Sequence, residues 1–126
     1  MVFRVIIAGG RKFNDYKLLK AKLDYYLQHK VKEGYEIIIV SGGATGADSL
    51  GERYAIENGY PIERYIAEWN KYGLSAGPRR NKQMADIANA CVIFWNGTSK
   101  GTKNMRDLAI TKGLPLKTVY YWCNMI

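Results

Sequence analysis

Histidine and cysteine are scarce in this chain of 126 residues, which contains one histidine, His29, and two cysteines, Cys91 and Cys123. Metal sites of the His/Cys type need clusters of these residues, so we expect no bound metal. The same scarcity excludes a Ser–His or Cys–His nucleophile near the glycine-rich turns described below. Cys91 lies in an apolar run, where a thiol packs as a small hydrophobic group.

Long apolar runs are also absent. No stretch approaches the about 20 apolar residues that a membrane-spanning helix needs. Residues 1–8 contain one charge, Arg4, and lack the pattern of a signal peptide. Hydrophobic residues make up 48% of the chain, as in folded proteins. We therefore expect a single domain over residues 1–126, located in the cytoplasm and without a membrane partner.

Acidic residues are the minority, and the net charge is +8. Lys and Arg outnumber Asp and Glu in residues 1–33 and 79–126, whereas acids prevail in residues 34–78. The excess favours anionic partners, either a phosphorylated small molecule or a nucleic acid backbone. The alternative is that many of the lysines are solvated on helix faces.

Apolar, β-branched segments alternate with segments of helical periodicity. Strands are expected at residues 2–8, 36–40, 62–67, 91–95 and 116–121, and helices at 16–32, 47–58, 79–90 and 102–112. Residues 68–78 have no period, so we expect a loop there. The alternation predicts an α/β fold with a five-stranded, mainly parallel sheet of strand order 3-2-1-4-5.

Glycine-rich turns follow three of the expected strands, at residues 8–11, 41–48 and 96–102. Such turns let backbone amides approach an anion, and the following helix adds the positive end of its dipole. In the predicted sheet all three turns lie at the carboxyl edge, where the chain reverses between strands one and four and where ligands bind. The second turn fits neither a Walker A loop nor the Gly-x-Gly-x-x-Gly pattern.

We predict that these turns and the start of the helix at residue 79 bind a phosphorylated ligand. Arginines offer a bidentate fork to phosphate, and hydroxyls and amides at a helix start also suit it. The candidate residues are Gly9, Gly10, Arg11, Ser41, Gly42, Gly43, Gly46, Ala47, Asp48, Arg79, Arg80, Asn81, Trp95, Gly97, Thr98, Ser99, Gly101 and Thr102.

Each candidate also has a structural alternative. Glycines form tight turns, hydroxyls cap helices, and arginines are solvated at surfaces. Trp69, Tyr72 and Trp95 either stack on a base or pack in the core. Asp48 either binds a ribose hydroxyl or a metal-bound water, or stabilises the helix start.

Four segments, residues 5–11, 41–48, 76–81 and 94–102, together resemble the SLOG superfamily, and more narrowly its small bacterial and phage branch of YpsA-related proteins. The resemblance spans nearly the whole chain. It implies a Rossmann-like, three-layer α/β/α fold that binds nucleotides or their derivatives. The superfamily includes LOG-type enzymes, which cleave the N-glycosidic bond of nucleoside monophosphates, and Smf/DprA proteins, which bind single-stranded DNA.

The third turn departs from the LOG-type pattern Pro-Gly-Gly-x-Gly-Thr-x-x-Glu. Gly101 and Thr102 match its Gly-Thr pair, but the Pro-Gly-Gly start is absent and Met105 occupies the position of the glutamate. The resemblance thus keeps the part that holds phosphate and loses the acid that acts on the ribose. This departure favours binding over hydrolysis.

Three functions follow as hypotheses. The preferred one is a sensor or binding module for a nucleotide or nucleotide-derived phosphorylated ligand, without a cofactor. The second is a nucleotide-processing enzyme, such as a nucleoside-phosphate N-glycosidase, in which Asp48 or Glu68 replaces the missing glutamate. The third is single-stranded nucleic acid binding, which predicts steep salt dependence and affinity that grows with length. Related dimeric folds and the ten tyrosines also suggest a homodimer.

Overall fold

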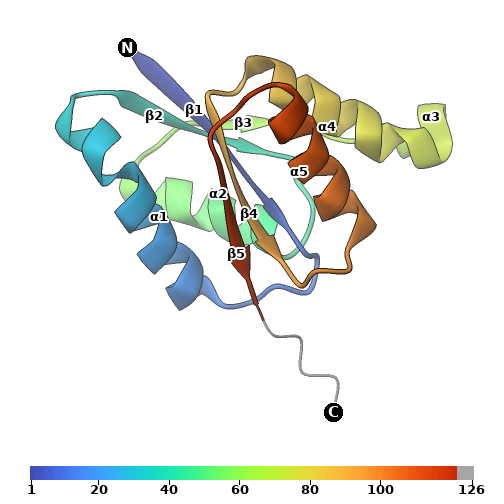
Figure 1. Ribbon diagram of the computed structural model, residues 1–126, viewed down its shortest axis with the longest axis horizontal. Coiled ribbons are helices and arrows are strands. Elements are labelled where there is room, and N and C mark those ends of the chain that lie inside the picture. Colours follow the sequence, from blue (N-terminus) through green and yellow to red (C-terminus); the bar gives the residue numbers. More distant parts are fainter. Residues whose placement is uncertain (122–126) are drawn as a thin grey trace.

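Five parallel strands form one sheet in the computed structural model, which describes residues 1–121 (Figure 1). The strand order is β3-β2-β1-β4-β5, and every neighbouring pair is parallel. The strands are β1 (Val2–Gly9), β2 (Glu36–Ser41), β3 (Ile62–Arg64), β4 (Ala90–Trp95) and β5 (Leu116–Tyr120). The predicted sheet and its order are confirmed, although β3 ends three residues before its expected end.

Four longer helices cover the two faces of this sheet (Figure 1). They are α1 (Tyr16–Lys32), α2 (Ala47–Asn58), α4 (Ala76–Ile87) and α5 (Lys100–Thr111). Alternate residues of β1 point to opposite faces: Val5 and Ile7 pack with α1 and α2, and Ile6 and Ala8 pack with α4 and α5. The structure is therefore the expected three-layer α/β/α sandwich, with a core on each side of the sheet.

The first helix shows how the sequence produces these layers. Asp15 caps α1 by accepting a hydrogen bond from the Leu18 amide at 3.0 Å. Leu19, Leu23 and Leu27 recur every four residues and are buried against the sheet. Each buried leucine contributes about 1.5–3 kcal/mol of apolar burial, so packing against the strands stabilises α1 more than its cap does.

The expected loop at residues 68–78 is wrong, because most of this segment is helical. It contains α3 (Trp69–Tyr72), the 3₁₀ turn η1 (Gly73–Ser75) and the first turn of α4. Pro78 does not interrupt α4, since a first-turn residue has no intrahelical partner for the amide that proline lacks. The short elements carry no long hydrophobic period and therefore escape periodicity analysis.

The chain reverses direction across the sheet at β1, the central strand. From β1 it passes outward to β2 and β3, and it then returns to place β4 and β5 on the other side of β1. The carboxyl ends of β1 and β4 consequently lie side by side at one edge, where the turns that follow them diverge to opposite faces. No helix within residues 1–121 combines the length and apolar character that crossing a membrane requires.

Candidate functional site

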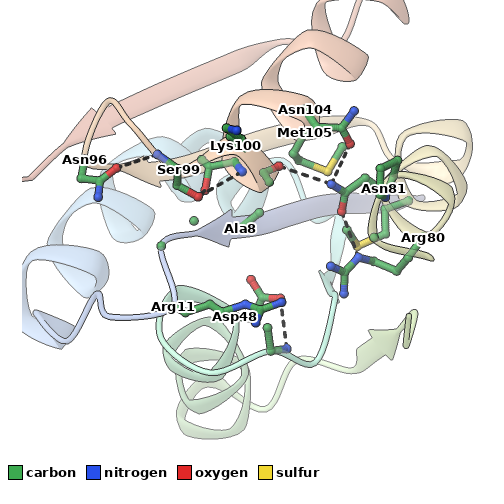
Figure 2. Close-up of a pocket in the computed structure, with 18 of the residues that line it drawn as sticks. Ala8, Arg11, Asp48, Arg80, Asn81, Asn96, Ser99, Lys100, Asn104 and Met105 are labelled. Atoms are coloured by element: carbon green, nitrogen blue, oxygen red, sulfur yellow. Dashed lines mark hydrogen bonds between the residues drawn. The ribbon is translucent and has the colours of Figure 1, made fainter. Parts of the chain in front are cut away.

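A cavity of about 590 Å³ opens at the carboxyl edge of the sheet, between the turns that follow β1 and β4 (Figure 2). We call it the main cavity. The starts of α2, α4 and α5 complete its wall. The predicted site residues that line it are Gly9, Gly10, Arg11, Asp48, Arg80, Asn81, Ser99, Gly101 and Thr102. Residues as far apart in sequence as Gly9 and Thr102 therefore share one concave surface.

A second, smaller depression of about 270 Å³ adjoins the main cavity, and we call it the side hollow. The predicted residues Gly42 and Gly43 line it, together with Thr45, Ile66 and Ala67. Arg11, Ala44, Trp69 and Arg80 line both spaces. Gly42 and Gly43 of the second turn thus line the side hollow rather than the main cavity, whereas Asp48 of the same turn lines the main cavity.

The first two turns lock together through their glycines. Gly46 has a φ of +78°, and a side chain there would collide with the carbonyls of Gly10 and Arg11. The Ala47 amide donates to the Gly10 carbonyl at 3.1 Å, and the Gly10 amide donates to Phe94 at 3.0 Å. These contacts join the end of β1 to β4 and to the start of α2, so Gly46 permits close packing of two loops.

The second turn uses its backbone amides internally. The Gly43 amide donates to the Ser41 hydroxyl at 3.1 Å, and the Ala44 amide donates to the Asp48 carboxylate at 3.2 Å. Ser41 is fully buried and donates its own proton to Glu52 at 2.7 Å. Protein oxygens therefore occupy two of the amides that an anion would otherwise bind at this turn.

The third turn leaves amides that face the main cavity. The Asn96 side-chain oxygen accepts from the amides of Thr98 and Ser99, at 2.9 and 3.0 Å, and holds the turn in shape. Within residues 1–121, the Lys100 and Gly101 amides at the start of α5 have no hydrogen-bond acceptor. An anion in the cavity would bind these two amides at the positive end of the helix dipole.

Two guanidinium groups and one carboxylate set the charge of the cavity. Arg11 lies beside Asp48, and Arg80 donates to the Gly42 carbonyl at 2.7 Å (Figure 2). Burial lowers the pKa of Arg80, and the nearby Arg11 charge lowers it further, although Asp48 opposes both. Lys12 and Lys100 also line the main cavity and add positive charge to it. Cations therefore outnumber the single carboxylate among the lining residues.

Asp48 is 6% exposed, and burial raises its pKa despite the Ala44 amide and the Arg80 charge. It is the one acidic side chain among the residues that line the main cavity. Glu68, the other carboxylate considered from the sequence, lines neither space. Any acid–base chemistry by a carboxylate in the main cavity thus depends on Asp48.

The wall opposite Asp48 is fixed by an amide network between α4 and α5. Asn81 is buried and donates to the Asn104 side-chain oxygen at 2.9 Å, while its own oxygen accepts from Arg80 at 2.9 Å. Within residues 1–121, every buried side-chain nitrogen and oxygen has a partner. The network orients the Arg80 guanidinium before any ligand arrives.

Several predicted residues line neither space. Arg79 is exposed, lies over the Tyr72 ring at 4.2 Å and donates to Ser75. The Trp95 indole packs under α5 and donates to the Ser99 carbonyl at 3.1 Å. The others are Ser41, Gly46, Ala47, Gly97 and Thr98. These residues shape or brace the turns.

Sequence reasoning missed four polar residues of the main cavity: Lys12, Asn96, Lys100 and Asn104. Lys12 and Lys100 directly follow the predicted site residues Arg11 and Ser99. The positive charge beside these two glycine turns could therefore have indicated both lysines. Asn96 opens an Asn-Gly-Thr-Ser sequence, which is typical of a side chain that caps its own turn. Asn104 becomes apparent only when α4 and α5 are packed together.

Comparison with known proteins adds two sequence findings. A family model described as YspA, cpYpsA-related SLOG family (YAcAr) matches residues 3–72. The chain is also 32% identical to the Gene 61 protein of Mycobacterium phage D29 over 119 residues, which cover 90% of this chain and 93% of that protein.

Two solved structures share the fold. One is DNA processing protein A (DprA) from Streptococcus pneumoniae, with a TM-score of 0.68 and 18% identity. That match covers 94% of this chain and 50% of the DprA chain, so this chain spans half the length of DprA. The other is TM1055, with a TM-score of 0.63 and 18% identity, covering 92% of this chain and 72% of that one. At this identity the likeness concerns the fold alone.

Proposed function

The chain belongs to the YspA, cpYpsA-related SLOG family, and from this premise we propose that its main cavity binds a nucleotide or a nucleotide-derived phosphorylated ligand. The observation that carries the proposal is the convergence of Arg11, Arg80 and the start of α5 on one cavity at the chain reversal of a parallel sheet. This is the place where open α/β sheets bind ligands.

The charges favour a phosphate group at the α5 side of the cavity. The Lys100 and Gly101 amides supply donors there, and the Lys100 side chain adds a cation. Asp48 lies near the second turn and would repel a phosphate placed beside it. The phosphate is therefore expected against α5, and the uncharged part of the ligand is expected to extend toward Asp48, whose carboxylate accepts hydrogen bonds from hydroxyl or amino groups.

A matched pair of arginine variants tests this proposal. Arg11 lines the main cavity and has no hydrogen-bond partner within residues 1–121, whereas Arg79 lies outside; both contact an aromatic ring. Calorimetric titration with AMP and with ADP-ribose should show saturable binding of at least one of them. Arg11→Ala should weaken that binding about tenfold or more, the loss of one charge-assisted contact of about 1.5–3 kcal/mol.

Arg79→Ala should bind like the parent. Equal affinity in the parent and Arg11→Ala would refute the placement of the ligand, and an absence of binding by either compound at millimolar concentration would refute the function. The small molecule that copurifies with the native protein, identified by mass spectrometry, supplies the natural ligand for the same comparison.

The buried Asp48 carboxylate favours a second candidate, hydrolysis of the N-glycosidic bond of a nucleoside phosphate. In such a reaction water adds to the sugar carbon C1′, the bond to the base breaks, and the base leaves with a proton. A carboxylate with a raised pKa beside the ligand suits the proton transfer. Met105 at the far side of the cavity supplies no acid.

Incubation of the protein with AMP, followed by chromatography for free adenine, tests this candidate. Release that is abolished in Asp48→Asn would establish turnover. No release by a protein that binds AMP would leave the binding module as the function. The Arg11→Ala variant separates the two outcomes further, because it should reduce binding whether or not turnover occurs.

A further inference from the structure

We propose that the main cavity and the side hollow form one bipartite site for a ligand with two nucleoside halves joined through phosphate. The inference rests on the proposed function of the main cavity and extends it to the class of ligand. Its basis is the shared wall: Arg11, Ala44, Trp69 and Arg80 line both spaces. A ligand that crosses from one space to the other must pass these residues.

The junction is cationic. Arg80 uses Nη1 on the Gly42 carbonyl and Nε on Asn81, and within residues 1–121 its Nη2 has no partner. The Arg11 guanidinium is likewise without a hydrogen bond. The Asp48 carboxylate also lies beside these two guanidinium groups, and it offsets one of their two charges. The net charge of the junction is therefore positive, and a phosphate linker held by the two guanidiniums would use donors that no group within residues 1–121 occupies.

The lining of the side hollow indicates an uncharged occupant. The Gly43 and Ala44 amides already donate to Ser41 and Asp48, so these two amides are not available to a second phosphate. The walls are instead small or apolar, with Gly42, Gly43, Ile66 and Ala67 beside the Trp69 ring. Such a surface accepts the flat face of a base, which stacks on an aromatic side chain.

The volumes of the two spaces also indicate that they hold different parts of the ligand. The side hollow, at about 270 Å³, falls below the about 300–1,000 Å³ of pockets that enclose whole small ligands. The main cavity, at about 590 Å³, lies within that range. The main cavity thus holds one nucleotide, and the side hollow takes the base or sugar of a second half.

The experiment compares dinucleotides with a mononucleotide. NAD has halves joined by pyrophosphate, and the dinucleotide pApA has halves joined by a phosphodiester; AMP is common to both. We expect NAD or pApA to bind about tenfold or more tightly than AMP, because the second half binds intramolecularly once the first is held. The dinucleotide that binds more tightly than AMP shows whether the site prefers a pyrophosphate or a phosphodiester linkage.

Variants of residues that line only one of the two spaces test which space provides the higher affinity for dinucleotides. Thr45 and Ile66 are exposed and line the side hollow but not the main cavity, so Thr45→Trp or Ile66→Trp should fill the hollow in a folded protein. Either variant should abolish the dinucleotide advantage and leave AMP affinity unchanged. Lys100→Ala, on the main cavity alone, should weaken AMP and dinucleotides equally. Circular dichroism checks that each variant is folded.

The possible failures are distinct. If AMP binds but neither dinucleotide binds more tightly, or if the advantage survives both tryptophan variants, the bipartite site is refuted and the proposed function stands. If no compound binds, the proposed function fails as well.

Discussion

At the scale of single residues, Asp48 combines a negative charge with deep burial. Burial raises its pKa above the usual 3.8, so between these two values the folded protein binds more protons than the unfolded chain. The free energy of unfolding therefore falls as the pH rises through this window and levels off above the folded pKa. Asp48→Asn removes this contribution.

We predict that the free energy of unfolding of Asp48→Asn, minus that of the parent, becomes more positive as the pH rises from 4 toward neutrality. Urea titrations of both proteins at several pH values measure the difference. A difference that does not change with pH would contradict the raised pKa. Asp86→Asn is the control, since ion pairs with Lys112 and Lys82 lower the pKa of that exposed carboxylate from 3.8, so its difference should stay nearly constant from pH 4 toward neutrality.

Replacing Gly101 by alanine should have opposite effects on the stability of the protein and on its affinity for AMP. It lies in the first turn of α5 and lines the main cavity, and a Cβ at this position would meet no atom within 4 Å. Gly101→Ala should therefore stabilise the protein by up to about 1 kcal/mol, the difference in helix propensity. The added methyl group should weaken AMP binding, because it occupies ligand space.

Thermal unfolding and calorimetry measure the two effects of Gly101→Ala together. Ile110→Ala, at an exposed position of the same helix outside the cavity, should leave AMP affinity unchanged. Unchanged affinity in Gly101→Ala would place the ligand away from the start of α5.

The sequence could not distinguish Arg79 from Arg80. Successive helical residues point about 100° apart, so one of two adjacent arginines faces the cavity and the other faces solvent. Deciding between them requires knowing which face of α4 is turned toward the cavity. That helix begins at Ala76, within the segment expected to be a loop. The internal use of the Gly43 and Ala44 amides was equally hidden, because it depends on the side chains of Ser41 and Asp48 folding back onto their own turn.

At the scale of elements, the turn at residues 96–102 depends on one side chain. Asn96 accepts from two amides and from the Thr98 hydroxyl. We predict that Asn96→Ala destabilises the protein by about 1–2 kcal/mol, the cost of amides that lose an acceptor. The start of α5 should become more mobile, and AMP affinity should fall.

Hydrogen exchange of the Thr98 and Ser99 amides, which donate to Asn96, measures this loosening. Asn96→Asp, which retains the acceptor oxygens, should preserve slow exchange. Its added negative charge should still weaken the binding of a phosphate. Slow exchange in Asn96→Ala would show that the turn is held by other contacts.

The longer elements were predictable because their physics is local. Continuous apolar, β-branched runs and helical periodicity require no knowledge of the fold, and the parallel sheet follows from the alternation of strand and helix. Elements that depend on their neighbours were not predictable. The four residues of α3 present no helical period, and β3 ends at Arg64 although apolar residues continue beyond it.

At the scale of the whole molecule, two groups of cations differ in their surroundings. Several cations form ion pairs one helical turn apart, including Lys20–Asp24, Lys82–Asp86 and Lys103–Asp107. Such exposed pairs contribute little to stability and add little to the field around the molecule. The cations of the main cavity are a smaller, localised group that matches a compact anion better than an extended strand.

This distribution predicts how salt affects binding. When the logarithm of affinity is plotted against the logarithm of salt concentration, each phosphate contacted on a single-stranded nucleic acid contributes about −0.7 to the slope. A ligand with one or two phosphates carries few condensed counterions and should therefore give a slope no steeper than about −1.4, and oligo(dA) of increasing length should bind no more tightly than the dinucleotide. Titrations of NAD, pApA and oligo(dA) from low to high salt measure both quantities. A slope that steepens and an affinity that rises with oligonucleotide length would instead assign the positive charge to nucleic acid binding, since only an extended strand reaches cations beyond the cavity.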